Sequence, residues 1–319
     1  MPEVSVVVPT RNRRRLLLRT LGTVRAQRDV DLEVVVVDDG SADGTADAVA
    51  ALGDARITVV RHERAGGVSA ARNAGLASAR APWVAFLDDD DLWAPDKLAA
   101  QLGAATDEGA GWVCGGAVTI DRALRIVSGQ LPPSPEVVWQ LPAFNSVPGG
   151  GSGTMARTSL VREVGGFDPA LSNIADWDLW IRLSAQAPLA VVSRPLTAYL
   201  RHPTSLSHDL TSVRDEFDHA RRKHAGARAA RGLPDSSRTL EWFAHRQVQA
   251  GNRRAAARAY FDLWRRHDSR KSLRWAAVAL VAPGPLRRRR DRLSLGRLPR
   301  WWLDEAEGWL APLREGGWS

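Results

Sequence analysis

The stretch Trp83-Val-Ala-Phe-Leu-Asp88-Asp89-Asp90-Asp91-Leu-Trp93 decides the fold of this chain. An apolar run of strand length stops in four consecutive carboxylates, and a helix is predicted to open at Ala94-Pro95-Asp96-Lys97-Leu98. Ligands of an open α/β sheet bind beyond the carboxyl ends of its strands, so these aspartates are expected at a binding edge. Two interpretations are open: a solvated acidic turn, or oxygen ligands for a hard divalent cation that also contacts substrate phosphates.

Strands and helices alternate through the first hundred residues. Apolar runs of strand length occupy residues 4–8, 32–37 and 57–60, and helical patterns or turn signals follow each of them. A repeat of about 25 residues predicts βαβ units and an α/β fold, with a Rossmann-like, mostly parallel sheet flanked by helices. Polar clusters end the first, second and fourth strands, which places all three clusters on one edge of the sheet.

The pattern is less regular from Gly109 to Tyr199 and becomes helical after His208. Strands are predicted at 112–120, 190–193 and 196–200, helices at 158–164 and 175–183, and a helical hairpin around Gly251. We therefore expect an α/β catalytic domain over 1–208, a helical extension over 209–270 and a basic amphipathic tail over 271–319.

Charge and composition restrict the cellular setting. The net charge of +8 lies in the tail, because residues 271–302 carry nine basic side chains and one acid. Cys114 is the sole cysteine, which excludes a disulfide framework and fits a reducing compartment. There is no apolar signal-peptide core at the N-terminus, and the longest apolar run, 275–283, is far short of the roughly 20 residues of a membrane span. A cytoplasmic location is expected.

Several motifs occur in a fixed order along residues 3–208. They are Pro9-Thr10-Arg11-Asn12-Arg13, Asp38-Asp39-Gly40-Ser41, Gly67-Val-Ser-Ala-Ala-Arg72-Asn73-Ala-Gly75, Asp88-Asp-Asp-Asp91, Gly165-Gly-Phe-Asp168, Asp176-Trp-Asp-Leu-Trp-Ile-Arg182 and Tyr199-Leu-Arg-His202. With these motifs the chain resembles the family 2 glycosyltransferases of the GT-A fold. That resemblance implies transfer of a sugar from a nucleotide-diphosphate donor with inversion at the anomeric carbon.

The resemblance implies a donor site at the first strand ends. Asp39 would accept the ring N–H of the base, and an Asx turn is the alternative for this residue. Gly67 and Arg72 would contact the diphosphate, since backbone amides and arginine near a helix start suit phosphate; a surface ion pair is the alternative for Arg72. The segment that packs on the base and ribose is matched by Pro9, Thr10, Arg11 and Arg13.

The acidic run matches the family pattern Asp-x-Asp-Asp. By this resemblance Asp90 would bind a divalent metal, Mg2+ or Mn2+, and Asp88 would contact the ribose or the metal. Asp89 is an extra carboxylate that leaves the register open, and we assign it to the nucleotide sugar. His202 resembles a histidine that reaches the metal or the diphosphate, with a structural histidine as the alternative.

Inversion requires a base on the acceptor hydroxyl, opposite the departing diphosphate. Asp176 matches the carboxylate that serves this purpose in the family, although Ala175 stands where the family commonly has glutamate. Gly151, Ser152 and Trp177 are expected to line the acceptor site, because sugars stack on aromatic rings and glycine allows close backbone approach.

The predicted function is metal-assisted glycosyl transfer in bacterial cell-surface polysaccharide or glycoconjugate synthesis, with a glycan or lipid-linked acceptor. Two alternatives stay open. The arginine-rich tail suits a non-catalytic nucleotide- or nucleic-acid-binding protein, but interleaved aromatic residues are missing, so no nucleic acid is expected. A nucleotidyltransferase on a similar fold would carry a glycine-rich phosphate loop where this chain reads Pro9-Thr10-Arg11-Asn12.

The tail allows two interpretations. Leu273 to Val281 and Leu293 to Trp302 bring leucine and tryptophan beside arginine, a pattern typical of a segment lying in an anionic membrane interface. Residues 271–302 would then attach the protein peripherally to the inner face of the membrane. The alternative is that these apolar groups pack on the catalytic domain while the arginines stay solvated.

Overall fold

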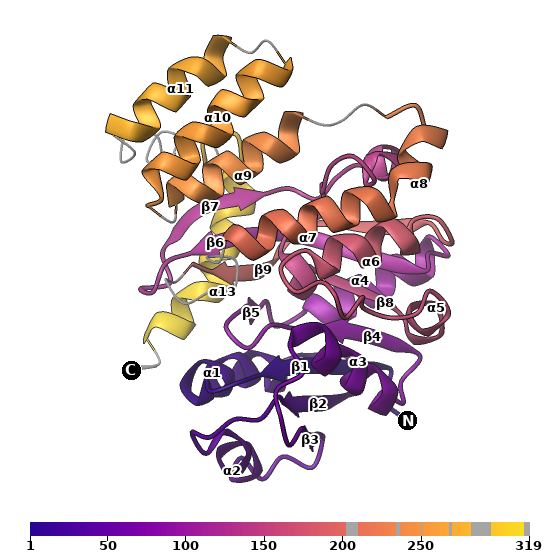
Figure 1. Cartoon of the computed structure of the whole chain (residues 1–319). Coiled ribbons are helices and arrows are strands. Elements are labelled where there is room, and N and C mark those ends of the chain that lie inside the picture. Colours follow the sequence, from indigo (N-terminus) through magenta and orange to yellow (C-terminus); the bar gives the residue numbers. More distant parts are fainter. Residues whose placement is uncertain (202–209, 234–236, 250, 268–269, 282–294, 316–319) are drawn as a thin grey trace. The chain divides into compact units, whose positions relative to one another are not determined.

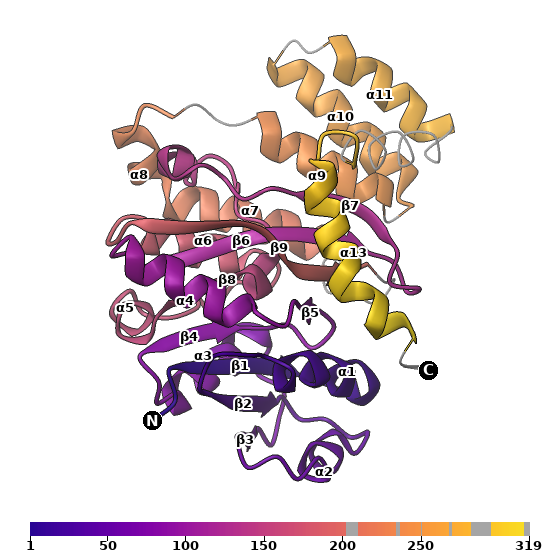
Figure 2. The same ribbon diagram turned by 180° about the vertical axis from the view of Figure 1, so that it is seen from behind.

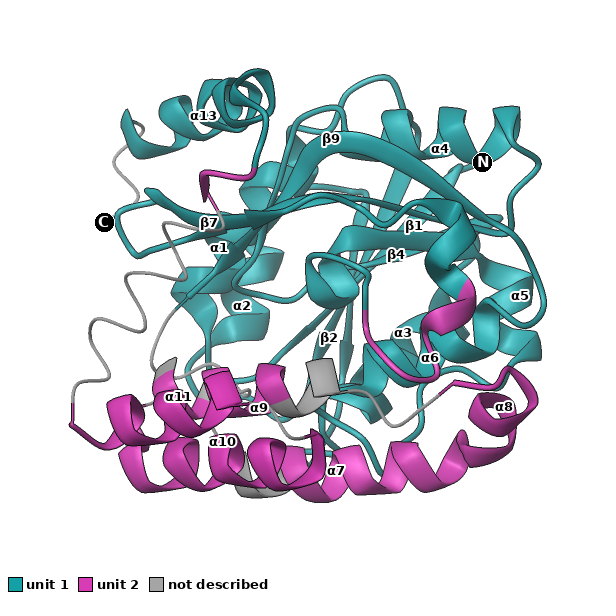
Figure 3. Ribbon diagram, turned by 90° about the horizontal axis from the view of Figure 1, so that it is seen from above, with its two compact units in different colours: residues 1–138, 146–201, 298–319 teal, residues 139–145, 202–297 magenta. Residues whose placement is uncertain are grey.

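The computed structural model describes residues 1–201, 210–233, 237–249, 251–267, 270–281 and 295–315 (Figure 1). The chain forms two compact units (Figure 3). Unit 1 comprises residues 1–138, 146–201 and 298–319, and unit 2 comprises residues 139–145 and 202–297. The C-terminal helix thus belongs to the same unit as the N-terminal sheet, a division that the sequence did not predict.

The N-terminal half of unit 1 is the predicted βαβ arrangement. Strands β1 (Val4–Thr10), β2 (Leu32–Asp38), β3 (Ile57–Arg61) and β4 (Trp83–Phe86) are parallel, in the order β3-β2-β1-β4. Helices α1 (Arg14–Arg25), α2 (Thr45–Ala50) and α3 (Val68–Ser78) connect them. Every residue of β1 and β2 is buried, as expected for strands with both faces covered.

The other half of the sheet mixes strand directions. β8 (Thr154–Arg157) is antiparallel to both β4 and β6 (Trp112–Ile120), and β7 (Ile126–Gln130) is antiparallel to β6. β9 (Leu189–Leu200) runs parallel to β6. The two strands predicted at 190–193 and 196–200 are therefore one strand, whose register shifts at Gly115 and Gly116 accommodate Pro195.

The acidic run does not lead straight into a helix. After it, β5 (Leu92–Trp93) pairs antiparallel with β9, and α4 (Lys97–Asp107) begins only at Lys97. The predicted helix does open within Ala94–Leu98, but three residues later than Ala94, whose backbone N–H donates to the carbonyl of Leu196 in β9. Unit 1 also contains α5 (Thr158–Glu163), α6 (Ala175–Leu183) and the short 3-10 turn η2 (Gly150–Gly153); another such turn, η1 (Pro135–Gln140), precedes it.

Helix α13 (Arg300–Glu315) packs on the sheet beside β9 (Figure 2). Trp302 is fully buried in a cluster with Ile120 and Leu200. Gly116 makes room for the indole ring, because a Cβ at this position would lie 2.7 Å from Trp302. Trp301, by contrast, is 56% exposed. Residues 282–294, with the four consecutive arginines 287–290, lie outside the described residues.

Unit 2 is helical, with α7 (Leu210–Lys223), α8 (Ala225–Ala230), α9 (Ser237–Gln249), α10 (Arg253–His267) and α11 (Arg270–Val281). Gly251, at φ +80°, separates α9 from α10, so the predicted hairpin is confirmed. Val248, Tyr260, Leu263 and Ala279 form part of its apolar core. Within the described ranges, no helix combines the length and apolar character needed to cross a membrane.

Candidate active site

The carboxylate of Asp39, just beyond the end of β2, holds the loop that leads into α3. Its Oδ1 accepts from the backbone N–H of Gly66 and contacts His62 Nδ1, both at 2.8 Å, and its Oδ2 accepts from Gly67 at 2.9 Å. Burial opposes ionisation of Asp39, but these hydrogen bonds outweigh it and keep its pKa below the ordinary value. Gly67 has φ +88°, a left-handed conformation that favours glycine.

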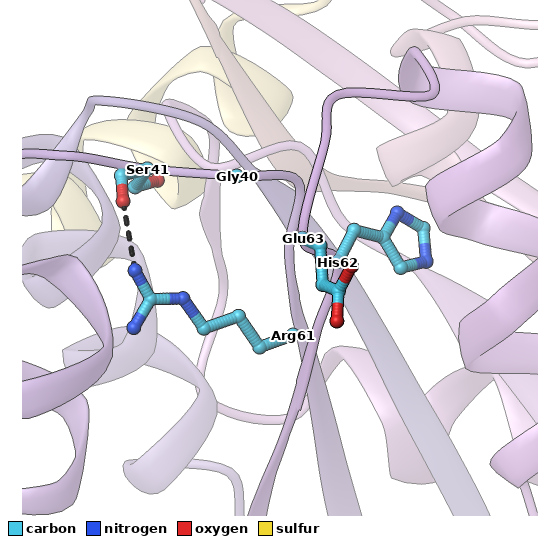
Figure 4. A pocket seen from close by; sticks show the side chains of 5 residues that line it. All are labelled: Gly40, Ser41, Arg61, His62 and Glu63. Carbon is cyan, nitrogen blue, oxygen red and sulfur yellow. Dashed lines mark hydrogen bonds between the residues drawn. The ribbon is translucent and has the colours of Figure 1, made fainter.

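A half-open pocket of about 420 Å3 lies beyond the ends of β2 and β3. It is lined by Gly40, Ser41, Arg61, His62 and Glu63 (Figure 4). Arg61 reaches across to the carbonyl of Ser41 at 3.1 Å, while the ring of His62 points to the opposite side of the chain. The neighbouring carboxylate of Asp38 accepts from the N–H of Ser41 at 2.8 Å and closes the turn.

Two of the four aspartates face the first strand. Thr10 donates to Asp89 at 2.7 Å, and Arg13 contacts Asp89 at 3.0 Å and Asp90 at 2.9 Å. Burial, together with the charge of Asp90, raises the pKa of Asp89 to about 7. Thr10 at the end of β1 and Arg13 just after it thus bind two carboxylates of the acidic run.

Asp91 is the structural member of the run. It is fully buried, accepts from Ser152 Oγ at 2.6 Å and from the N–H of Leu200 at 3.1 Å, and burial raises its pKa well above the ordinary value. Ser152 Oγ in turn accepts from the N–H of Asp88 at 3.1 Å. These bonds connect the acidic run to η2 and β9.

Asp88 points toward α3, where it forms an ion pair with Arg72. With 31% of its side chain accessible, Asp88 is the most exposed of the four aspartates. The guanidinium of Arg72 is 5.1 Å from the centre of the Phe167 ring. Arg72 itself is 5% exposed, and its Nε has no hydrogen-bond partner among the described residues. Such a buried, unused donor is suited to an anionic ligand.

Asp176 lies in the first turn of α6, close to Arg72 and η2. Burial raises its pKa to about 6, against the opposing charge of Arg72 and a hydrogen bond from the Trp177 N–H at 2.6 Å. Asp178, two residues on, is fully buried and paired with Arg182 at 2.6 Å. Of these two carboxylates, only Asp176 belongs to the same cluster as Arg72 and Asp88.

The structure brings together most of the residues predicted for the site. Arg13, Arg72, Asp88, Asp89, Asp90 and Asp176 form one charged cluster, with Thr10 and the η2 residues Gly151 and Ser152 against it. Asp39 and Gly67 meet in the neighbouring loop. Pro9 is buried in β1 and Arg11 is exposed. Ser152 and Trp177, predicted at the acceptor site, are 0% and 6% exposed, and His202 lies outside the described residues.

Several residues at this site were not predicted. His62 follows β3 as an isolated histidine, and Phe167 was quoted only within the motif Gly165-Gly-Phe-Asp168, without a role of its own. Their contacts with Asp39 and Arg72 reveal them. Trp93 and Gln101 donate to the η2 backbone, and Lys97 contacts the carbonyl of Thr154 where β8 begins. Within the ranges that the structure describes, no three His, Cys, Asp or Glu side chains converge as a metal site.

The fold and the charged cluster at its strand ends define a protein of the GT-A class. Residues 5–161 match the family model "Glycosyl transferase family 2". The segment 5–161, about half of the chain, belongs to this family, as its motifs predicted.

The comparisons agree with this assignment. Succinoglycan biosynthesis protein ExoO of Rhizobium meliloti is 39% identical over 148 residues, which cover 45% of this chain and 42% of ExoO. The chain therefore spans less than half the length of that relative. The structure of S. aureus TarS 1–349 with UDP-GlcNAc has a TM-score of 0.55 at 17% identity, covering 91% of this chain and 92% of TarS. The mannosyltransferase PcManGT of Pyrobaculum calidifontis, in complex with GDP-Man and Mn2+, has a TM-score of 0.51 at 22% identity, covering 97% and 85%. These two structures establish the fold, which confirms the predicted GT-A class.

Proposed function

We propose that this chain is an inverting glycosyltransferase that moves a sugar from a nucleotide-diphosphate donor to an acceptor hydroxyl. The observation that carries the proposal is the position of Arg72 between Asp88 and Asp176, with a buried Nε that has no partner within the described residues. A cation that lies close to two carboxylates can serve two tasks. It can bind an anionic leaving group on one side and orient a base on the other.

In this reaction Asp176 takes the proton of the acceptor hydroxyl. The hydroxyl oxygen bonds to the anomeric carbon while the bond from that carbon to the diphosphate oxygen breaks, so the configuration inverts. A carboxylate whose pKa is about 6 is mostly ionised at neutral pH and is a stronger base than an ordinary aspartate. Arg72 and Arg13 stabilise the negative charge that develops on the diphosphate.

The donor nucleotide is assigned to the loops around Asp39. The half-open pocket lined by Gly40, Ser41 and His62 lies at the ends of β2 and β3, and His62 contacts the Asp39 carboxylate. Thr10 and Arg13 extend from the same edge toward the acidic run. Relatives of the fold are named with UDP-GlcNAc and GDP-Man, which supports a nucleotide-sugar donor.

The residues present fit a divalent metal held mainly by its substrate. Asp88 and Asp90 supply the one or two carboxylates that Mg2+ or Mn2+ takes when phosphate oxygens provide further ligands. Both are paired with arginine in this structure, which compensates their charge. When bound, such an ion would neutralise charge on the leaving diphosphate. His202 remains proposed as a further ligand.

For the acceptor we propose a glycan or a lipid-linked glycan, in bacterial cell-surface polysaccharide or glycoconjugate synthesis. The naming of ExoO for succinoglycan biosynthesis supports this choice. The exposed basic residues of α11 support a cytoplasmic protein that attaches peripherally to an anionic membrane: Arg270, Lys271 and Arg274 lie there with the exposed Leu273 and Leu280.

The test is a thermal-shift panel of UDP-glucose, UDP-GlcNAc and GDP-mannose, with and without Mn2+, because a ligand of the native state raises the apparent unfolding temperature. Each donor that shifts the transition is then assayed for release of nucleoside diphosphate. Metal-dependent release that is lost in Asp176→Asn supports the proposal. Binding without release by the wild-type protein with any acceptor glycan would favour a non-catalytic nucleotide-binding protein.

A further inference from the structure

Three side chains that follow the acidic run contact the backbone at the end of η2 and at the first residue of β8, Thr154. The carbonyls concerned are the three consecutive ones of Ser152–Thr154. Trp93 Nε1 donates to the first at 2.8 Å, and Gln101 Nε2 donates to the second at 2.9 Å. Lys97 Nζ lies 3.5 Å from the third. The three consecutive backbone carbonyls are therefore contacted by side chains from β5 and α4.

All three donor side chains are buried. Trp93 is 1% exposed, whereas Lys97 and Gln101 are completely buried. The Lys97 ammonium lies 3.8 Å from the centre of the Trp93 ring, and burial lowers its pKa well below the ordinary value. Burying a lysine with so few partners is costly, and an apolar side chain of similar length would avoid that cost. Stability therefore does not account for Lys97, which points to a role in the backbone that it contacts.

The opposite side of η2 lies against the reacting groups. A Cβ added to Gly150 would be 3.4 Å from Asp176 Oδ2, and one added to Gly151 would be 3.3 Å from an NH2 nitrogen of Arg72. One turn of backbone thus separates the three buried donors from the proposed base and the proposed diphosphate ligand. A shift of this turn changes the space available to both groups.

We propose that Trp93, Lys97 and Gln101 are positioning residues that fix η2 against Asp176 and Arg72. The inference rests on the catalytic roles proposed for those two residues. A displacement of about 1 Å at such a site can lower turnover roughly 100-fold. The three donors share this task, so loss of one is expected to lower kcat about tenfold.

The sharpest test is Trp93→Phe, which removes the indole N–H and keeps an aromatic ring beside Lys97. Its matched control is Trp112→Phe: Trp112 is fully buried, and its Nε1 donates to the carbonyl of Ala187 at 3.2 Å, away from the cluster. We expect kcat to fall about tenfold in Trp93→Phe and less than twofold in the control. The Kd for UDP, or for GDP if the panel selects guanine, is expected to stay within twofold in both. Gln101→Met should repeat this pattern.

Two outcomes would overturn the inference: equal kcat in Trp93→Phe and Trp112→Phe, or a loss that falls on the nucleotide Kd instead. Hydrogen exchange provides a readout that does not depend on turnover. Amides of residues 149–154 should exchange faster in Trp93→Phe than in either the wild type or the control, and unchanged exchange would also overturn it. If the wild type releases no nucleoside diphosphate, the proposed function fails, and the exchange result still decides whether these residues hold the turn.

Discussion

Arg72 and Asp88 form an ion pair whose two partners differ sharply in exposure. Only 6% of the arginine side chain is accessible, against 31% of the aspartate side chain. The arginine is thus a fixed charge inside the protein, whereas the carboxylate faces the space that a ligand would enter. This asymmetry, together with the proximity of Asp176, leads to the first three predictions.

Asp176→Asn is expected to lower transfer by roughly 100-fold or more, the usual loss for a general base. Nucleotide binding should persist, because the loops around Asp39 do not involve α6. Steady-state kinetics with saturating donor, together with calorimetric titration of UDP, separates the two effects. If nucleotide affinity collapses while turnover at saturation survives, Asp176 is a binding residue and the base lies elsewhere.

The pH dependence of kcat should report the same carboxylate. Asp176 acts as a base only when ionised, so kcat is expected to rise with pH through about 6, where its pKa lies. Arg72 lowers this pKa by its charge. Arg72→Met should therefore move the acidic limb of the profile to higher pH, in addition to lowering kcat. An acidic limb at the same pH in wild type and Arg72→Met would show that Arg72 does not act on the catalytic base.

Metal dependence should reside in Asp88 and Asp90. Asp90→Asn is expected to abolish metal-dependent turnover while the fold is retained, and Asp88→Asn should weaken Mn2+ binding in the presence of UDP. Calorimetric titration of Mn2+ into each UDP-bound variant gives the metal affinity directly. Near-normal transfer by Asp90→Asn would refute its assignment as a metal ligand.

The C-terminal helix should contribute to stability as well as covering the sheet. Because Trp302 is fully buried, Trp302→Ala is expected to lower the free energy of unfolding by about 3–5 kcal/mol. The neighbouring Trp301→Ala should have a much smaller effect, since Trp301 is 56% exposed. Denaturant unfolding of both variants tests this contrast, and equal losses would contradict the packing of α13.

Membrane attachment should depend on charge. Anionic vesicles are expected to retain the protein at low salt and release it at high salt, since each basic residue near the surface contributes about 1 kcal/mol. Reversing Arg270, Lys271 and Arg274 to glutamate should weaken retention. Removing residues 271–319 is a poor test, because it would also delete the buried Trp302.

The matched control for that charge reversal is the triple substitution Arg15→Glu, Arg28→Glu and Arg122→Glu in unit 1, where all three side chains are exposed. The net charge change is the same in both variants, so loss of retention only in the α11 variant locates the contact. Equal binding to neutral and anionic vesicles, or no binding to either, would rule out the electrostatic anchor.

The sequence alone determined the local features of this protein. Valine-rich runs at 4–8 and 32–37 predicted strands covered on both faces, and polar clusters at strand ends predicted the binding edge. The order of short motifs was enough to identify the family. These features depend on neighbours in the chain, so periodicity and turn chemistry reveal them.

Only the tertiary structure decided which charged groups face one another. Four adjacent aspartates are indistinguishable in sequence, yet Asp91 is buried on Ser152 and Leu200 while Asp88 stays accessible beside Arg72. The burial of Lys97 could not be read from the sequence, and packing of the tail on the catalytic domain, as α13 shows it, was one of two open interpretations. In each case the contact joins segments that are far apart in the sequence. For the aspartates and Lys97, desolvation by those distant neighbours decides whether the charged group is buried or accessible.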